Sequence, residues 1–556
     1  DLKKPELYVL TRDTNAGYVS FESDSTIVEK LSGLFPVFFF LIAALVCSTT
    51  MTRMIDDERT QIGTLRALGY SRGSILAKYL LYSGSAAALG CVIGYFAGGY
   101  VFPFVIWTAY GMLYSIPGFV ILYDPVLFVI ALAASLLCSA GTTYLALRIE
   151  MQNMPANLIR PKTPAAGKRI FLERITPLWK RLKFLHKVSL RNIFRFKKRM
   201  IMMILGIAGC TALVLTGFGI HDSVANIANF QFDDIQKYDV SAQFSDTLTE
   251  DKINEVESDH KSELDAATAV QMTSGDVTGD SITKSAYIVA SDDPAITDIF
   301  DLHIDGETVP YPGKGEVLLT EKLAELTDIK TGDTVTVSVS DTEKAELKVA
   351  GLVENYVQNY LYMTGETYAM VADKGYEPKT LLLRVNDSAD EYALSAALSK
   401  TDGVSSVSVV TDTRNMIDQM MQSLNYVVAL VLISAGALAF IVLFNLGNIN
   451  LTERVREIAT IKVLGFHSRE TGAYVFRENI ILSMMGIIVG LPLGVLLHTF
   501  VLMQIRVDMV SFKTVIAPVS FLLTVVMVVL FTVITDLVMR KKIAKIDMAE
   551  SLKSIE

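Results

Sequence analysis

Cysteine is scarce in this sequence, with four residues among 556. All four lie inside apolar runs, where a thiol behaves as a small buried residue, so we expect neither a disulfide framework nor a cysteine-ligated metal site. The six histidines form no Ser/His/Asp, Cys/His or zinc-binding pattern with other residues. These absences argue against an enzyme with catalytic groups of its own. The four cysteines are Cys47, Cys91, Cys138 and Cys210.

Two binding motifs are also absent. No Gly-x-x-x-x-Gly-Lys-Ser/Thr loop for nucleotide phosphates occurs, because Gly313-Lys314 lacks both the spacing and the following hydroxyl residue. The acidic residues between positions 222 and 307 match no EF-hand loop, and we interpret them as a solvated surface. We therefore expect no directly bound cofactor and no metal.

Apolar residues dominate what is present. They make up 51% of the chain, charged residues make up 20%, and the mean hydropathy is +0.40, a composition typical of membrane proteins. Seven runs reach the roughly 20 apolar residues that a helix needs to cross a bilayer. The predicted fold class is a membrane α-helical bundle with an inserted extracellular α+β domain. The expected spans lie near residues 31–51, 79–104, 125–148, 200–220, 426–448, 479–503 and 515–539.

Charge is sorted along the chain. Basic residues cluster in four groups, whereas residues 221–425 are rich in Asp and Glu. Because Lys and Arg mark the cytoplasmic side of a membrane protein, alternating the spans places all four basic groups in the cytoplasm and residues 221–425 outside. One topology thus satisfies every loop and makes the C-terminus cytoplasmic. The basic groups lie at residues 53–78, 148–199, 454–477 and 540–545.

The same topology places residues 1–30 outside, although no signal peptide or span precedes them in this sequence. We interpret them as the remnant of an external stalk. The longer protein would then carry at least one additional N-terminal span and an external domain of its own. An intact gene that begins at or near Asp1 would contradict this expectation.

The sequence contains an internal duplication. The segment from Gln61 to Tyr70 matches the segment from Glu457 to Phe466 at an offset of 396 residues, and the tail at Met548–Leu552 echoes Met154–Leu158 more weakly. The first offset also pairs two sets of three glycines, each spaced four residues apart. Two unrelated features in one register argue for duplication. The paired glycines are Gly90, Gly94 and Gly98 with Gly486, Gly490 and Gly494.

Each copy of the first segment predicts a short amphipathic helix on the cytoplasmic side. Apolar residues recur every three positions, and a glycine is placed to end the helix. The loop that contains each helix is too short to form a core around its apolar stripe. We therefore expect the stripe to dock in a groove of a cytoplasmic partner. The alternative is a helix that lies on the lipid headgroups. The predicted coupling residues are Ile62, Leu65, Arg66, Leu68 and Gly69 in one copy and Glu457, Ile458, Ile461, Lys462, Leu464 and Gly465 in the other.

The glycine ladders each lie on one face of a span and allow close approach of a neighbouring helix. Static packing is one interpretation, and a sliding contact in a moving bundle is the other. The spans carry no central run of ionisable residues, so an ion or proton path through the bilayer is poorly supported.

Residues 221–425 predict a compact α+β domain. Alternating runs at residues 334–339 and 346–349 predict strands, and residues 321–326 and 391–398 predict helices. Residues 415–425 have helical character, which predicts either a stalk that continues the next span outward or a plain connector.

The linker at residues 149–199 is strongly basic. Its end predicts an amphipathic helix on the inner leaflet, and the neighbouring span holds it at the bilayer, so anchoring to lipid is favoured over nucleic-acid binding. The apolar side of this helix would carry Leu185, Val188, Ile193 and Phe196.

Residues Glu453–Gly465, and less closely Asp57–Gly69, resemble the Glu-Arg-x-x-Glu-Ile-x-x-Leu-Arg-Ala-Leu-Gly signature of the FtsX-like permease family of ABC transporters. That family includes MacB-type exporters, lipoprotein-release permeases and bacitracin-resistance permeases. Gln61 stands where the family usually has Glu. The resemblance covers nearly all of the membrane-embedded chain and, loosely, Lys314–Ala350.

This resemblance implies a permease of a bacterial cell membrane whose two short helices contact a separate ABC ATPase, present in two copies, which would bind the ATP. The permease would export or extract a peptide, lipid-linked or hydrophobic substrate. The rival hypothesis is a non-transporting transmitter that controls an external partner such as a cell-wall hydrolase. The lipid bilayer and an external protein or peptide are the other expected partners, and nucleic acid is not.

The expected organisation joins these elements in chain order. It comprises the external stalk remnant (1–30), a first FtsX-like three-span unit (31–148), the cytoplasmic linker (149–199), a span (200–220), the extracellular domain (221–425), a second FtsX-like three-span unit (426–540) and a cytoplasmic tail (541–556).

Overall fold

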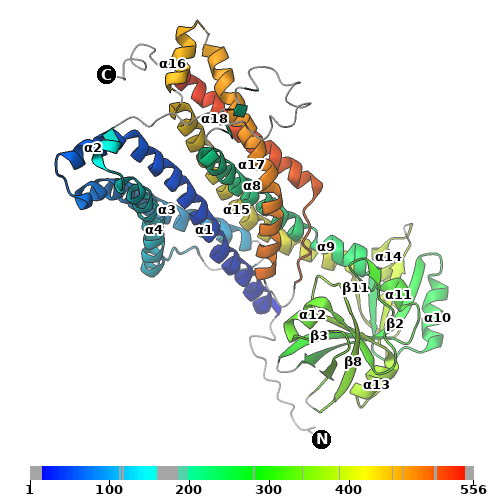
Figure 1. Cartoon of the computed structure of the whole chain (residues 1–556). Coiled ribbons are helices and arrows are strands. Elements are labelled where there is room, and N and C mark those ends of the chain that lie inside the picture. Colours follow the sequence, from blue (N-terminus) through cyan, green and yellow to red (C-terminus); the bar gives the residue numbers. More distant parts are fainter. Residues whose placement is uncertain are drawn as a thin grey trace. The chain divides into compact units, whose positions relative to one another are not determined.

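The computed structural model of this chain divides into two compact units (Figure 1). Among the described residues, the sheet domain comprises residues 16–27, 223–425 and 505–513, and the helix bundle comprises residues 28–222, 426–504 and 514–544. The structure describes residues 16–111, 114–115, 118–159, 187, 190–191, 193–194, 197–279, 282–340, 342–386, 388–453, 455–465, 468–505 and 510–544. Most of the linker and the tail after Ala544 lie outside these residues, as do Leu185, Val188 and Phe196 of the predicted amphipathic helix. Ile193, the fourth apolar residue of that helix, is helical and buried.

Seven helices in the described part of the chain are long and apolar enough to cross a membrane, which confirms the predicted spans. Several extend beyond the predicted limits. Helix α1 begins at Ala16, and α15 begins at Val410, so the predicted stalk at residues 415–425 is one helix with the span that follows it. The seven are α1 (Ala16–Asp57), α3 (Arg72–Tyr110), α4 (Pro125–Met151), α8 (Lys197–Ala225), α15 (Val410–Glu453), α17 (Ser468–Gln504) and α18 (Pro518–Ala544).

Local signals in the sequence set where these helices begin. Helix α3 starts after Ser71, whose hydroxyl accepts a hydrogen bond from the Ser74 N–H at 3.1 Å. Helix α4 starts after Asp124, whose carboxylate accepts from the Val126 N–H, with Pro125 in the first helical position. Both side chains satisfy N–H groups that have no partner within the helix. In the described part of the bundle there are also three short helices, α2 (Arg59–Ala67), α5 (Pro155–Ile159) and α16 (Val455–Val463).

The duplicated halves of the bundle meet along α1 and α15. The Arg53 guanidinium donates to the carbonyl of Ile449 at 3.3 Å, and these two residues are 396 positions apart. Nearby, the Asn445 amide donates to the Thr50 hydroxyl at 2.8 Å. A two-fold interface between two copies of one motif places equivalent positions side by side. The two halves therefore contact each other in register at these helices.

The sheet domain contains a nine-stranded sheet of mixed strand direction. The predicted strands at residues 334–339 and 346–349 are β7 and part of β8, and the predicted helices are α12 and α14. The strands are β1 (Val240–Phe244), β2 (Leu264–Thr278), β3 (Thr283–Ala290), β6 (Glu316–Thr320), β7 (Thr334–Ser338), β8 (Lys344–Val353), β9 (Tyr360–Met363), β10 (Thr380–Val385) and β11 (Val404–Val409), with a separate pair β4 (His303–Ile304) and β5 (Glu307–Thr308). The helical segments are α9 (Ile227–Asn229), the π-helix η3 (Phe230–Ile235), α10 (Glu250–Asp259), α11 (Ile296–Ile299), α12 (Glu321–Thr327), α13 (Gly365–Val371) and α14 (Glu391–Leu398).

Six of these strands close into a barrel. The strand order runs β2-β3-β9-β6-β8-β7, and β7 pairs back onto β2 through Val277 and Val337. Each barrel strand contributes a fully buried apolar side chain to one core. These residues are Val277, Ile288, Leu361, Val317, Val349 and Val337.

The remaining strands form a split β-α-β unit around the barrel insertion. Strands β1 and β2 flank α10, strands β10 and β11 flank α14, and the order β11-β1-β10-β2 is antiparallel throughout. A second core lies under these strands, with Val256 from α10 and Leu394 and Leu398 from α14. The long strand β2 therefore belongs to both the barrel and the split unit.

Closure of the barrel depends on a missing side chain at Gly275. A Cβ there would lie 2.6 Å from Ile288 Cδ1 and 2.7 Å from the backbone oxygen of Ser338. We predict that Gly275→Ala destabilises the sheet domain by about 1–3 kcal/mol, because the backbone must move. Faster hydrogen exchange of β2 and β7 in the full chain would show this.

Gly313→Ala is the control for this prediction, because its Cβ would have only Glu316 Oε2 nearby, at 3.5 Å. It should change the stability by less than about 0.5 kcal/mol. Unchanged exchange in Gly275→Ala would contradict the closure of β7 onto β2.

Candidate functional site

Helices α2 and α16 stand at the two predicted coupling segments. Each is followed by a glycine in the left-handed region, Gly69 with φ of +92° and Gly465 with φ of +94°. A residue with a Cβ is strained in that conformation. The duplicated sequence therefore folds twice into the same helix and the same turn.

The apolar stripes of these helices are more buried than expected. Ile62 and Ile458 are both 0% exposed. Ile62 lies in a cluster with Tyr79 and Leu147 from neighbouring spans, and Ile458 lies in a cluster with Phe476. The expectation that so short a loop gives the stripe no core was wrong, because the ends of the adjoining spans extend far enough to supply one.

Only the C-terminal end of each stripe is open. Leu68 is 72% exposed and Leu464 is 71% exposed, whereas Leu65 and Ile461 are half-buried. Tyr70 is exposed beside the first turn. Each coupling segment thus presents one exposed leucine directly before its glycine, above a buried base. The second segment also contains Glu457, which lies within α16.

Arg66 and Lys462 hold the segments to the bundle. Arg66 Nη1 donates to the carbonyl of Met151, the last residue of α4, at 3.1 Å and to that of Asn153 just beyond the helix. Lys462, its equivalent in the second half, donates to the carbonyl of Ile543 at the end of α18. A cation at a helix C-terminus binds carbonyls that have no partner within the helix. The sequence predicts that both residues contact a partner, and the structure gives them a capping role within the bundle.

A second short helix lies against α2. A Cβ at Gly63 would be 2.9 Å from both Leu158 Cβ and Ile159 Cγ1, so the absence of a side chain lets α5 approach closely. The Arg59 Nε lies 3.5 Å from Glu150 Oε2 and adds an ion pair at the same end of α4. Helix α5 contains most of the Met154–Leu158 peptide that the tail of the chain echoes, and this role could not be read from the echo alone.

Glu58 fixes the start of α2. Its carboxylate accepts hydrogen bonds from the Tyr79 hydroxyl at 2.6 Å and the Lys78 ammonium at 2.9 Å. These bonds lower the pKa of Glu58 below its ordinary value, with the bond from Tyr79 making the largest contribution. Core contacts, caps and this carboxylate together give the helix a defined orientation.

The two glycine ladders differ in their surroundings. A Cβ at Gly486, Gly490 or Gly494 would lie 2.6 to 2.9 Å from side chains of α8, at Ile207, Thr211 and Leu215. This is the close helix packing that glycines permit in a membrane. At Gly90, Gly94 and Gly98 a Cβ would meet nothing within 4 Å among the described residues. The first ladder therefore makes none of the predicted packing contacts there, because no described helix of the first half corresponds to α8.

This difference provides a matched pair of substitutions. We predict that Gly490→Leu lowers the thermal stability of the detergent-solubilised chain, at a cost of about 1–3 kcal/mol or more, because the new side chain must displace α8. Gly94→Leu should leave the stability unchanged. Size-exclusion chromatography after heating measures both, and equal losses in the two variants would contradict the assignment.

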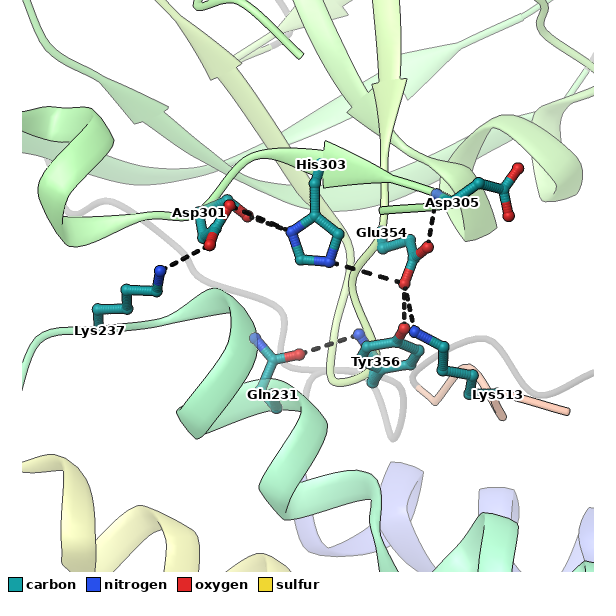
Figure 2. Close-up of polar contacts among 8 residues, drawn as sticks. All are labelled: Gln231, Lys237, Asp301, His303, Asp305, Glu354, Tyr356 and Lys513. Atoms are coloured by element: carbon teal, nitrogen blue, oxygen red, sulfur yellow. Dashed lines mark hydrogen bonds and ion pairs between the residues drawn. The ribbon is translucent and has the colours of Figure 1, made fainter. Parts of the chain in front are cut away.

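A second site lies in the sheet domain, around Glu354 at the end of β8 (Figure 2). Its carboxylate is 9% exposed and lies 3.0 Å from Lys513 Nζ. It also accepts a hydrogen bond from the Asp305 N–H at 2.8 Å and one from the Tyr356 hydroxyl. Burial alone would raise the pKa of Glu354, but these bonds outweigh it and lower the pKa below its ordinary value.

The ammonium of Lys513 has aromatic neighbours as well. It lies 5.4 Å from the centre of the Phe230 ring and 5.6 Å from that of Tyr356, distances at which a cation is attracted to a ring face. We call Phe230, Glu354 and Tyr356 the lysine site.

A chain of charged and polar groups continues from Glu354 across the domain. His303 lies between two carboxylates, with Nε2 3.9 Å from Glu354 and Nδ1 3.3 Å from Asp301. Lys237 is 2.6 Å from the other oxygen of Asp301, and this bond is the main reason that the pKa of Asp301 is lowered. Figure 2 shows the whole row.

Sequence reasoning missed the lysine site. Its signal was the presence of basic residues, Arg506 and Lys513, in the connection between the last two spans, whereas the equivalent connection of the first half, residues 111–124, has none. Glu354, the charged partner of Lys513, lies 159 positions away along the chain, and no local pattern links the two.

Comparisons with known proteins agree with this organisation. Residues 33–151 and 429–548 each match the family model described as FtsX-like permease C-terminal, and residues 200–401 match the model described as MacB-like periplasmic core domain. The two permease matches correspond to the two halves of the internal duplication. No curated protein matches the chain.

Two solved structures resemble part of the chain. The extracellular domain of the ABC-type transporter YknZ from Gram-positive bacteria is 14% identical, with 31% of this chain and 98% of that chain covered and a TM-score of 0.24. The periplasmic region of MacB from Actinobacillus actinomycetemcomitans is 14% identical, with 33% and 94% covered and a TM-score of 0.23.

Proposed function

The chain belongs to the FtsX-like permease family of multi-pass membrane proteins, and we propose that it serves an ABC transporter whose ATPase subunits are separate polypeptides that dock on α2 and α16. The ATPases would bind the ATP, since the sequence contains no phosphate-binding loop. The ends of the two helices, at Leu68–Gly69 and Leu464–Gly465, would be the contact points.

One observation carries this proposal. Two equivalent helix ends each expose a leucine by more than 70%, while the isoleucine six positions earlier is fully buried. An exposed apolar side chain on a rigid base is suited to insertion into a groove of a partner. Because the two halves are copies of one unit, two equivalent ends suit two copies of one ATPase.

The rigid base also explains how an ATPase could move the membrane part. Arg66 and Lys462 tie each coupling segment to the last span of its half, and Ile62 and Ile458 tie it to the neighbouring spans. Displacement of the helix end is then passed to the bundle with little loss, because the contacts would have to break for the helix to move alone.

The distribution of basic residues supports a sidedness for this arrangement. The coupling segments, the linker and the C-terminus would be cytoplasmic, and the sheet domain would face the outside of a bacterial cell membrane. The substrate would be a peptide, a lipid-linked molecule or another hydrophobic compound. Flux into vesicles with stimulated ATP hydrolysis would support transport, whereas nucleotide-dependent binding of an external protein without flux would favour a signal transmitter.

The docking proposal predicts the effect of a charge at each exposed leucine. Leu68→Asp and Leu464→Asp should each lower capture of the ATPase at one of the two positions at least about tenfold, because a carboxylate would replace an apolar contact and lose water on docking. Each single variant should retain one ATPase per permease, and the double variant none. Co-purification from membranes, with the stoichiometry of the complex, measures this.

Thr60→Asp provides the control for that experiment. Thr60 is exposed in the first turn of α2, where a carboxylate interacts favourably with the helix dipole, and capture should remain unchanged. Full capture by the double leucine variant would refute docking at these ends.

A further inference from the structure

The segment Val510–Lys513 lies in the connection between α17 and α18, yet it groups with the sheet domain and not with the helix bundle. Val510 pairs in an antiparallel bridge with Val357, and the Ser511 N–H donates to the carbonyl of Tyr356 at 2.9 Å. Two main-chain contacts and the side chain of Lys513 therefore hold one short segment to the domain.

The loop that receives this segment, residues 354–359, is itself fixed. The side-chain oxygen of Gln231, in η3, accepts hydrogen bonds from the N–H groups of Tyr356 and Val357 at 2.9 and 3.0 Å. Asn355 donates to the carbonyls of Val357 and Gln358, and Gln358 adopts a φ of +63°. These bonds are all made by residues of the sheet domain itself, and a loop fixed in this way lowers the entropy cost of holding the segment.

Electrostatics make Lys513 the strongest part of the contact. Glu354 is nearly buried, and a buried carboxylate is costly unless it is paired and hydrogen-bonded. Lys513 lies closer to it than His303 does, at 3.0 Å against 3.9 Å. An ion pair with so little exposure of the carboxylate is screened less than one on the surface.

The connection in the first half of the bundle has no such residue. Residues 111–124, between α3 and α4, contain neither Lys nor Arg. Lys513 is therefore a feature of the second half, in which the sheet domain is inserted between α8 and α15.

We propose that the Val510–Lys513 segment is a mechanical link between the α17–α18 pair and the sheet domain, held closed by Lys513 in the lysine site. The domain is then driven at this point in addition to its covalent connections through α8 and α15. Movement of the ends of α17 and α18 displaces the 354–359 loop, and with it the end of β8. The part of this inference that involves ATP rests on the proposed function.

The first experiment measures closure of the link without any ATPase. Val357→Cys and Val510→Cys are introduced together in the full chain in nanodiscs; opposed antiparallel residues have Cα atoms about 4.5–5.5 Å apart, within the range of a disulfide. Mild oxidation should join them, and mass spectrometry of the linked peptides distinguishes this pair from the native cysteines. Adding Lys513→Gln should slow the reaction at least about tenfold, as expected for loss of a hydrogen-bonded charge pair.

Lys314→Gln is the matched control, because it removes a lysine from an exposed ion pair with Glu366 on the same domain. It should leave the rate of disulfide formation unchanged. If Lys513→Gln likewise left that rate unchanged, the assignment of Lys513 as the residue that holds the link would be overturned.

The second experiment tests the transmission of movement. With the ATPase bound, addition of nucleotide should change hydrogen exchange at β8 and at residues 354–359. Lys513→Gln should abolish that change, and the oxidised Val357→Cys/Val510→Cys pair should restore it in the Lys513→Gln background, because a covalent bond replaces the ion pair.

Persistence of the nucleotide effect in Lys513→Gln would overturn the link, and so would its loss without restoration by the disulfide, since Lys513 would then act in another way. If no ATPase binds the unmodified chain, the docking proposal fails, and the rate of disulfide formation still decides whether Lys513 holds the segment.

Discussion

The contact between α1 and α15 is the constraint on which the helix bundle depends. Arg53 contacts Ile449, the residue at the equivalent position of the second half, so the two halves meet in register. In this register the end of α2 corresponds to the end of α16, and the helix end that Arg66 caps corresponds to the one that Lys462 caps. The bundle therefore presents one surface twice, which is the geometry that a pair of identical partners requires.

Much of this architecture could be predicted from the sequence, because membrane spans and duplicated segments leave strong local signals. Apolar runs located the seven helices, and the offset of 396 residues located both coupling segments with their glycine turns. The strands and helices predicted within residues 321–398 also appear in the sheet domain. Each of these elements is determined by residues that lie within a few tens of positions of one another in the chain.

The features that sequence analysis mispredicted or missed depend on contacts between distant residues. From the sequence, the apolar residue Ile62 is expected to be available to a partner. In the structure it is buried in a cluster that includes Leu147 of another span. Gly94 and Gly490 are equivalent in sequence, and only the presence of α8 makes one packed and the other open. The burial of Glu354 beside Lys513 likewise depends on a loop that folds back from a different part of the chain. The periodicity of apolar residues and the spacing of motifs carry no information about which distant residues become neighbours.

The sharing of strand β2 by the barrel and the split β-α-β unit has a thermodynamic consequence. Residues 264–270 of this strand pair with β10, and residues 271–278 pair with β3 and, near their end, with β7. Neither core can unfold without removing a strand from the other core. The domain should thus behave as a single cooperative unit, in which partial melting is suppressed and a disturbance at one rim is felt across both cores.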